Sequence, residues 1–510
     1  MQPDQLKNNS KRIAKNTLFL YLRQILVMLV ALYTSRVVLR VLGVVDYGVY
    51  NVVGGMVSMF AFLNAALAQA TERFIAFGIA KDTIEQQQKT FSMLLNVHMI
   101  MALLLFVLCE SIGLWFFYNK LVIPAERLDA AFWVMQCSIF TLMISVTQVP
   151  YNASIFGHEH MNAYAYISII EVMLKLGIVI LLQYAFTDKL IAYGILLALI
   201  QFVVAMIYRI YCLHKFENCK YKFYWSQSLF KKLFGYSGWS LIGNFAWTLN
   251  GQGMNMLINM FFGPLFNAAK GISNNVQSAV TSFATNFLGA SIPQIIKSYA
   301  SGDYEYCFKV NFKSGKFGFF LFMLISLPII SIIRPLLEIW LVNPPKYAVE
   351  FSMFSLLYVQ ANTMGGTLQN VAQATGKIRN FQLANGGVML LAVPVVYVIY
   401  KMGGPAISFL YVLIGTAISC LFAELIALKS ILPIYPVKRY LIEVTLREIA
   451  TFAIPCILAL ILYKMSFSYI VSFAIAGAMF LFSFFMIWII GFTKSERTWA
   501  KNIILNKIKR

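Results

Sequence analysis

A small set of charged side chains falls inside the long apolar runs of this 510-residue sequence, and these side chains are the first candidates for chemistry. The deepest in their runs are Arg23, Arg36, Glu171, Lys175 and Lys270. An ionised group in an apolar helix is costly to bury, so it normally faces a water-filled cavity, a ligand or an opposite charge. Because cations outnumber carboxylates in this set, it favours an anionic ligand.

Lys270 is the sharpest of these candidates, because no acidic residue lies within one helical turn of it. Glu171 and Lys175 are spaced i, i+4 with the acid first, which is the favourable order for a helical ion pair. The pair either neutralises itself for packing or couples to ion movement when the carboxylate takes up a proton. Glu110 is a second candidate for that proton site.

Polar side chains also follow one face of several apolar segments. They include Asn255 and Asn259 in the seventh segment, and Asn267 and Asn274 beside Lys270 in the eighth. Such amides either bridge neighbouring helices by hydrogen bonds or line a hydrophilic cavity. With the nearby cations, they suit a ligand that has many hydroxyls and an anionic group, such as a sugar linked to phosphate.

The composition identifies the surroundings of these side chains as a lipid bilayer. Hydrophobic residues make up 60% of the sequence and charged residues only 12%, where a globular chain has about 25% charged residues. A helix needs roughly 20 apolar residues to cross the hydrocarbon, and the sequence contains about fourteen such runs. Three of these runs carry polar stripes at helical spacing, at 235–262, 264–296 and 351–375. The sequence therefore predicts an all-α polytopic membrane protein.

The net charge of +21 sets the orientation. With the N-terminus inside, about 27 Lys and Arg fall in inner loops and tails and about 7 in outer loops. This excess predicts that both termini are cytoplasmic, and it explains the basic charge without nucleic acid as a partner. The seven cysteines lack metal or disulfide spacing, no nucleotide-binding motif is present, and we expect neither a cofactor nor enzymatic activity.

A weak internal repeat divides the chain. A shift of about 220 residues aligns Gly43 with Gly263 at two short turns, which implies two lobes of about six spans in the same orientation. The expected divisions are residues 1–230 for the N-terminal lobe, 231–435 for the C-terminal lobe, and 436–510 for two extra helices and a basic tail.

The N-terminal segment carries the most distinctive motif. Leu42-Gly43 followed by Asp46-Tyr47-Gly48, after the run from Asn16, resembles the start of polysaccharide biosynthesis flippases of the O-antigen type. That family belongs to the superfamily that also holds the multidrug and toxin extruders and the lipid II flippase. Its members commonly have twelve spans, whereas this chain has about fourteen, as in the lipid II flippase.

The resemblance implies a transporter of the bacterial inner membrane with a central cationic cavity that opens alternately to each side. The implied substrate is an undecaprenyl-pyrophosphate-linked oligosaccharide for O-antigen, capsule or exopolysaccharide, with a polysaccharide polymerase and glycosyltransferases as further partners. An ion-coupled multidrug or metabolite extruder of the same superfamily is the alternative, although it should favour a more acidic or aromatic cavity for cationic substrates. A scaffold role in an assembly complex also stays open.

Overall fold

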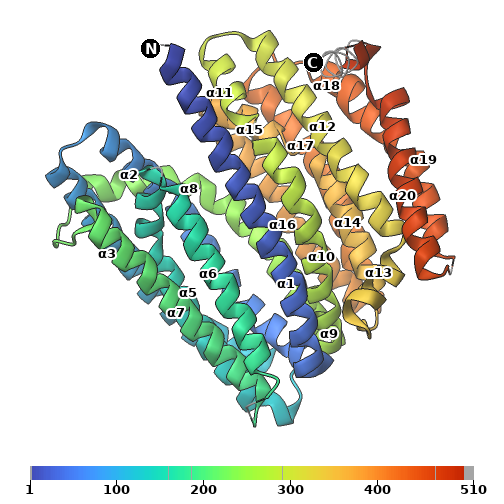
Figure 1. Cartoon of the computed structure of the whole chain (residues 1–510), viewed down its shortest axis with the longest axis horizontal. Helices are drawn as coiled ribbons and strands as arrows, with labels where there is room; N and C mark the ends of the chain where they lie inside the picture. The colour runs from blue at the N-terminus through green and yellow to red at the C-terminus, as the bar shows by residue number, and fades with distance from the viewer. Residues whose placement is uncertain are drawn as a thin grey trace. The chain divides into compact units, whose positions relative to one another are not determined.

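The structure of the chain is a computed structural model that describes residues 3–158, 160–184, 187–289, 291–465, 467–494 and 496–498. Within these residues the chain is helical and forms two compact units, Met1–Ala268 and Ala269–Arg510 (Figure 1). The predicted all-α membrane fold is confirmed. The divisions at residues 230 and 435 stay a prediction.

The described residues of the first unit form nine α-helices. They are α1 (Pro3–Met59), α2 (Phe62–Lys81), α3 (Ile84–Leu108), α4 (Leu114–Asn119), α5 (Leu128–Gly157), α6 (Met161–Leu181), α7 (Lys189–Lys215), α8 (Gln227–Thr248) and α9 (Met254–Phe262). Short 3-10 turns, η2 (Ala125–Arg127) and η3 (Glu217–Cys219), and the π-helical turns η1 (Cys109–Gly113) and η4 (Leu249–Gly253) join or interrupt them. The next helix, α10 (Pro264–Gly289), begins in this unit and continues into the second.

The second unit continues with ten α-helices. They are α11 (Ile292–Ala300), α12 (Tyr304–Ser331), α13 (Ile333–Leu341), α14 (Ala348–Thr363), α15 (Leu368–Thr375), α16 (Arg379–Lys401), α17 (Ser408–Ile431), α18 (Val437–Tyr440), α19 (Leu446–Tyr463) and α20 (Tyr469–Met486). The π-helical turns η5 (Leu441–Thr445) and η6 (Ile487–Gly491) precede α19 and follow α20.

Ten helical segments within the described residues are long and apolar enough to cross a membrane. The other predicted spans correspond to α2, to α8 with α9, to α10, and to α14 with α15. Three of them, α8 with α9, α10, and α14 with α15, carry the predicted polar stripes, and the last is divided by a break between Thr363 and Leu368. Polar residues and helix breaks are tolerated at membrane depth where other protein groups satisfy their hydrogen bonds, so these segments are candidates for a functional site.

The two glycines that the repeat aligns have the same backbone geometry. Gly43 has φ 80° and ψ 171° inside α1, and Gly263 has φ 80° and ψ −178° between α9 and α10. Residues with a Cβ rarely adopt this conformation. The shared geometry explains why both turns need glycine.

Gly48 of the Asp-Tyr-Gly motif allows a close approach of two backbones in the first unit. A Cβ built on Gly48 would lie 1.9 Å from the carbonyl oxygen of Pro264, at the start of α10. No side chain fits there, so this glycine lets α1 pack directly against the start of α10. The motif therefore has a packing function.

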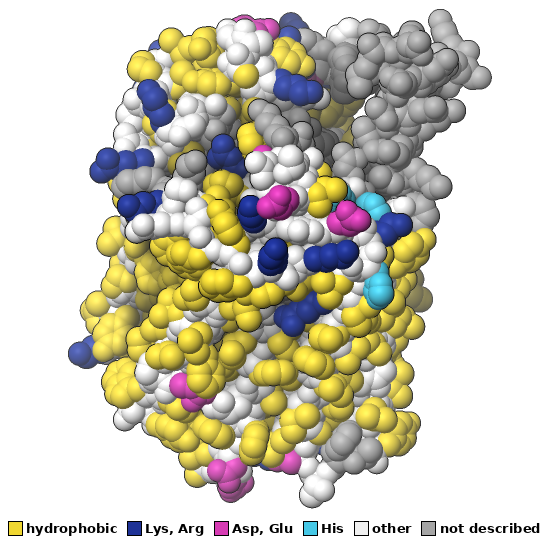
Figure 2. All heavy atoms as spheres, turned by 90° about the vertical axis from the view of Figure 1, so that its left-hand side faces the viewer, with side chains coloured by type: hydrophobic (Ala, Val, Ile, Leu, Met, Phe, Trp, Pro, Cys, Tyr) yellow, Lys and Arg dark blue, Asp and Glu magenta, His cyan; other side chains and the backbone are white. Residues whose placement is uncertain are grey.

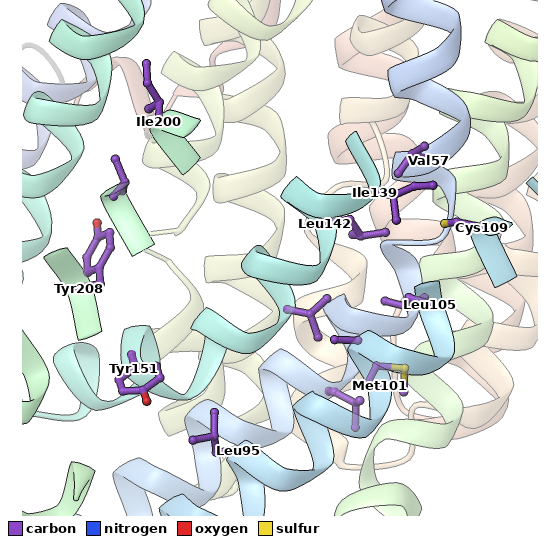
Figure 3. Close-up of a cluster of buried hydrophobic side chains, with 14 of the residues drawn as sticks. Val57, Leu95, Met101, Leu105, Cys109, Ile139, Leu142, Tyr151, Ile200 and Tyr208 are labelled. Atoms are coloured by element: carbon purple, nitrogen blue, oxygen red, sulfur yellow. The ribbon is translucent and has the colours of Figure 1, made fainter. Parts of the chain in front are cut away.

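A continuous hydrophobic core holds the first unit together. It contains buried side chains from α1, α3, α5 and α7, among them Val57, Leu105, Ile139 and Ile200 (Figure 3). On the outer surface seen in Figure 2, hydrophobic side chains cover the middle of the face and Lys and Arg gather mainly toward one end. This banding is what a protein surface in contact with lipid and headgroups requires.

Candidate functional site

Lys270 lies in α10 and is buried, with only 6% of its surface exposed. It forms no ion pair with any carboxylate in the described part of the chain. Its Nζ lies 5.1 Å from the centre of the Phe409 ring in α17, a cation-π distance. An aromatic face offsets only part of the cost of burying an ammonium group, so Lys270 is suited to an anionic ligand.

The helix that carries Lys270 is also held by a buried hydroxyl pair one turn away. Ser273 Oγ donates to the Phe351 carbonyl at 2.9 Å and lies 2.6 Å from Ser355 Oγ in α14. Both serines are fully buried. This contact holds α10 against α14, so the position of the Lys270 ammonium is set by packing on two neighbouring helices.

Arg36 lies in α1 and is partly buried, next to the buried side chains of Val37, Val38 and Leu39. No acidic partner is found for it among the described residues. Arg23 lies further back in the same helix, and its side chain falls outside the described part of the structure. Each of the two units therefore contains a cation without a carboxylate partner among the described residues, Arg36 in the first and Lys270 in the second.

The predicted ion pair in α6 forms. Lys175 Nζ donates to Glu171 Oε1 at 2.6 Å, and both side chains are partly exposed. The pairing explains how both residues are accommodated in one apolar helix. Their roles in substrate binding and ion coupling stay predictions.

Glu110 lies in the π-helical turn η1, and its Oε1 atom is buried without a hydrogen-bond partner. Single π-turns inside α-helices occur frequently at functional sites. Glu110 is thus an acid in an irregular helical turn, whereas the Glu171 carboxylate pairs with Lys175.

The asparagines predicted to line a cavity form a buried network in the first unit. Asn267 Nδ2 donates to Asn255 Oδ1 at 2.8 Å and to the Asn255 carbonyl at 2.7 Å, while Asn259 Nδ2 donates to Asn267 Oδ1 at 2.9 Å. Asn259 Oδ1 accepts from the Val122 amide, and Asn255 Nδ2 donates to the Asn51 carbonyl. These bonds join α9 and α10 to α1 and the loop before α5. Asn274, one turn beyond Lys270, is exposed.

Sequence analysis missed a charged cluster in the first unit. Arg127 Nε and Nη2 donate to the two carboxylate oxygens of Asp46 at 2.8 and 2.6 Å, and Arg127 Nη1 donates to Asp188 Oδ2 at 2.7 Å. Asp46 belongs to the Asp-Tyr-Gly motif, which was the one available signal. Burial raises the pKa of Asp188, but hydrogen bonds from Arg127 and from the Ile191 and Leu190 amides outweigh it, so the pKa lies below its ordinary value.

Two further acids were also missed, Glu424 in α17 and Glu448 in α19. Both are at least nine-tenths buried in the second unit. Glu448 lies in the first turn of its helix, next to Arg447. From the sequence alone, an acid at such a position is expected to be exposed. Only the packing of other helices around these positions reveals that they are buried.

The fold and the site can now be compared with known proteins. The sequence profile of a family described as polysaccharide biosynthesis protein matches residues 13–298, more than half of the 510-residue chain. No curated protein sequence matches the chain.

Solved structures of similar fold are transporters and a flippase. An inward-facing multidrug resistance MATE family transporter of the MOP superfamily has a TM-score of 0.63 at 14% identity, with 82% of this chain and 99% of that chain covered. The lipid II flippase MurJ in an inward closed conformation has a TM-score of 0.58 at 12% identity, with 92% and 98% covered. A MOP superfamily transporter from Pyrococcus furiosus has a TM-score of 0.55 at 12% identity, with 84% and 96% covered.

At these identities the structural similarity establishes the fold, and the sequence profile establishes the family. The resemblance seen in the N-terminal motif is therefore confirmed. This chain belongs to the polysaccharide biosynthesis protein family and has the fold of the MOP superfamily transporters.

Proposed function

We propose that this protein is a flippase. It moves undecaprenyl-pyrophosphate-linked oligosaccharide units from the cytoplasmic to the outer leaflet, for the synthesis of a cell-surface polysaccharide such as O-antigen, capsule or exopolysaccharide. The observation that carries the proposal, within the family and fold, is the buried Lys270 ammonium, which has no carboxylate partner in the described part of the chain.

The physical task is to carry a charged headgroup past hydrocarbon while the lipid tail stays in the bilayer. Removing a pyrophosphate from water without compensation is prohibitive. Lys270 and Arg36 supply fixed positive charge that replaces this water, and Arg23 and Lys175 are further candidates along the path. Asn274 lies one turn from Lys270 and offers an amide to the sugar hydroxyls, and we assign Asn255, Asn259 and Asn267 to the walls that position these groups.

The lipid tail needs an apolar surface beside the headgroup path. In the second unit, a groove of about 530 Å³ lies between α14 and α19, lined mainly by apolar side chains such as Phe354, Ile457 and Leu460. Its lining is suited to an acyl or prenyl chain. We propose that the two extra helices of this chain contribute a surface for the tail.

The direction of transport follows the proposed orientation, with both termini in the cytoplasm of a bacterium and the chain in its inner membrane. Basic inner loops favour this orientation. Glu110 and Glu171 are the proposed ion-coupling residues, with Glu110 preferred because its carboxylate is not paired with a lysine. A polysaccharide polymerase and glycosyltransferases are the proposed partners that use and supply the lipid-linked unit. The protein acts by transport, without a cofactor.

The test is deletion of the gene in its native host, followed by assay of the undecaprenyl-linked oligosaccharide with an impermeant sugar-oxidising reagent. Accumulation of the lipid-linked unit on the protected, cytoplasmic side is the expected result. Normal surface polysaccharide with altered resistance to cationic compounds would contradict the proposal and favour the multidrug or metabolite extruder.

A further inference from the structure

The second unit contains two buried carboxyl groups that the proposed function does not use. Glu448 in α19 has no exposed surface, and neither of its carboxyl oxygens has a hydrogen-bond partner in the part of the chain that the structure describes. Glu424 in α17 is 8% exposed and likewise forms no hydrogen bond or ion pair with a described residue. Neither carboxyl group is therefore explained by helix packing.

Glu424 faces a break in a membrane-spanning segment. The helix is interrupted at Gly365-Gly366 between α14 and α15, and a Cβ built on Gly365 would lie 2.5 Å from Glu424 Oε2. An interrupted helix at membrane depth is tolerated where other groups satisfy its backbone, and breaks of this kind form ion sites in secondary transporters. The carboxyl group of Glu424 thus lies directly against non-helical backbone.

Side chains from two other helices donate hydrogen bonds to backbone carbonyls at this break. Tyr440 of α18 donates its hydroxyl to the Met364 carbonyl at 2.7 Å, and Asn311 Nδ2 of α12 donates to the Thr367 carbonyl at 2.9 Å. Asn311 Oδ1 in turn accepts from the Tyr435 hydroxyl at 2.7 Å. The backbone groups released by the break are therefore satisfied by fixed, buried side chains.

Tyr440 also connects the two acids. Its ring is fully buried, and its hydroxyl lies within electrostatic range of both Glu448 and Glu424. The hydroxyl donates to the Met364 carbonyl and is also hydrogen-bonded to the Thr367 side chain, so it is held in place between the two acids by the backbone and side chains of the break.

Glu448 faces a lysine that is already paired with another acid. Lys316 Nζ of α12 lies 2.7 Å from Glu496 Oε2, with 5% and 7% of the two side chains exposed. Helices α12, α19 and α20 pack together at one side of the unit (Figure 1). Glu448 lies in electrostatic range of Lys316 without a hydrogen bond to it.

Lys316 of α12 and Tyr440 of α18 lie within electrostatic range of Glu448. Glu496 after η6, Arg447 of α19 and Glu443 of η5 lie around Lys316, and Glu424 of α17 lies near Tyr440. Arg447 and Glu443 are partly exposed, and Glu443 pairs with Arg439. Lys316 is therefore near two buried carboxyl groups but pairs with only one of them, Glu496, and a buried carboxylate without a partner takes up a proton instead.

We infer that Glu448 and Glu424, with Tyr440 between them, form a proton-binding site beside the break between α14 and α15. Release of a proton from Glu448 produces a second carboxylate that competes with Glu496 for Lys316. Proton release therefore weakens the contact that fixes the segment after η6, where Thr493 and Glu496 form a capping box. The inference goes beyond the flippase proposal, because proton binding needs no substrate.

The test uses infrared spectroscopy on the full chain in lipid nanodiscs without substrate, with pH as the variable. Protonated buried carboxyl groups give a C=O band that is separate from the carboxylate bands. We expect Glu448→Gln and Glu424→Gln each to remove a separate part of the pH-dependent band, beside any part that Glu110 of the first unit contributes. Glu305→Gln is the control, because the Glu305 side chain is 74% exposed and pairs with Arg439 at the surface.

Two results would overturn the site. The first is a full band in both variants when each has the thermal stability of the parent protein. The second is loss of the band in the parent protein when Na⁺ replaces K⁺ at constant pH, since a metal cation would then be the ligand. Failure of the flippase proposal affects neither measurement, because no transport is assayed.

Discussion

The Lys270 ammonium of α10 lies 5.1 Å from the centre of the Phe409 ring of α17, inside the second unit. The ring face stabilises the cation without neutralising it, so the net positive charge is kept for a ligand. This contact and others in the structure lead to measurable expectations.

Replacement of Lys270 by Ala should lower export of lipid-linked oligosaccharide at least tenfold with unchanged protein level, because the buried positive charge is lost. Lys270→Arg should retain more activity than Lys270→Ala. The control is Lys401→Ala, at the exposed end of α16. Export is measured as surface polysaccharide in a deletion strain that carries each variant, and equal export by Lys270→Ala and Lys401→Ala would remove Lys270 from the substrate path.

Replacement of Glu496 by Gln should destabilise the protein by about 3–5 kcal/mol, since it leaves Lys316 buried without its partner. A double change of Lys316→Met with Glu496→Leu should restore much of this loss, because an apolar pair of similar volume removes both charges. Thermal unfolding of the purified variants gives the comparison. A Glu496→Gln protein as stable as the parent would show that Lys316 finds another anion, with Glu448 the nearest candidate.

The pair of Lys316 and Glu496 should also make the free energy of unfolding depend on pH in the acid range. Burial raises the pKa of Glu496, but hydrogen bonds from Lys316 and from the Thr493 amide outweigh it, so the folded-state pKa lies below the unfolded value of about 4.3. The contribution is therefore complete above that value and is lost as pH falls through the lower folded-state pKa. The midpoint temperature of thermal unfolding of the parent protein should fall in that acid range. The midpoint of the Glu496→Gln variant should fall less.

Replacement of Arg127 by Gln should destabilise the first unit, since Asp46 and Asp188 lose the guanidinium that binds both. Because all three side chains are partly exposed, we expect about 1–2 kcal/mol, below the cost for a fully buried pair. Asp129→Asn is the control, an exposed acid two residues away. The low pKa of Asp188 adds an acid dependence of the same sign as that of Glu496, and the Arg127→Gln variant should lack it.

Replacement of Gly48 by Ala should destabilise the protein by about 1–3 kcal/mol, the usual cost of overpacking, because the new Cβ meets the Pro264 carbonyl oxygen. Gly415→Ala is the matched control, since Gly415 lies inside α17 with nothing within 4 Å of a built Cβ. The control should be neutral or slightly stabilising. Equal midpoints for the two variants would mean that α1 and α10 separate without cost.

Replacement of Asn267 by Ala separates the two interpretations of the asparagine network. If the network only joins α9, α10 and α1, the variant should lose midpoint temperature, and export should fall only as far as protein level falls. If Asn267 also contacts substrate, export per folded molecule should fall as well. Measuring both quantities on Asn267→Ala and Asn274→Ala, which changes an exposed amide on the same helix, decides between them.

Much of the fold could be predicted from the sequence, because bilayer burial acts on local composition. Long apolar runs define most spans without knowledge of their neighbours. The Glu171–Lys175 pair is also local, since its partners lie one turn apart in α6. The lack of a carboxylate near Lys270 was visible in the sequence, and the structure supplies none from other described elements.

The tertiary structure alone decided which polar groups meet. The link from Asn259 to Val122 joins residues 137 positions apart, and the pair of Lys316 and Glu496 joins residues 180 positions apart. Helical periodicity places such residues on a face but does not say which other helix covers that face. The environment of Glu448 depends on how α12, α18 and the segment after η6 pack in the folded chain. Whether a charged residue is buried therefore depends on this packing and not on the residue or its sequence neighbours.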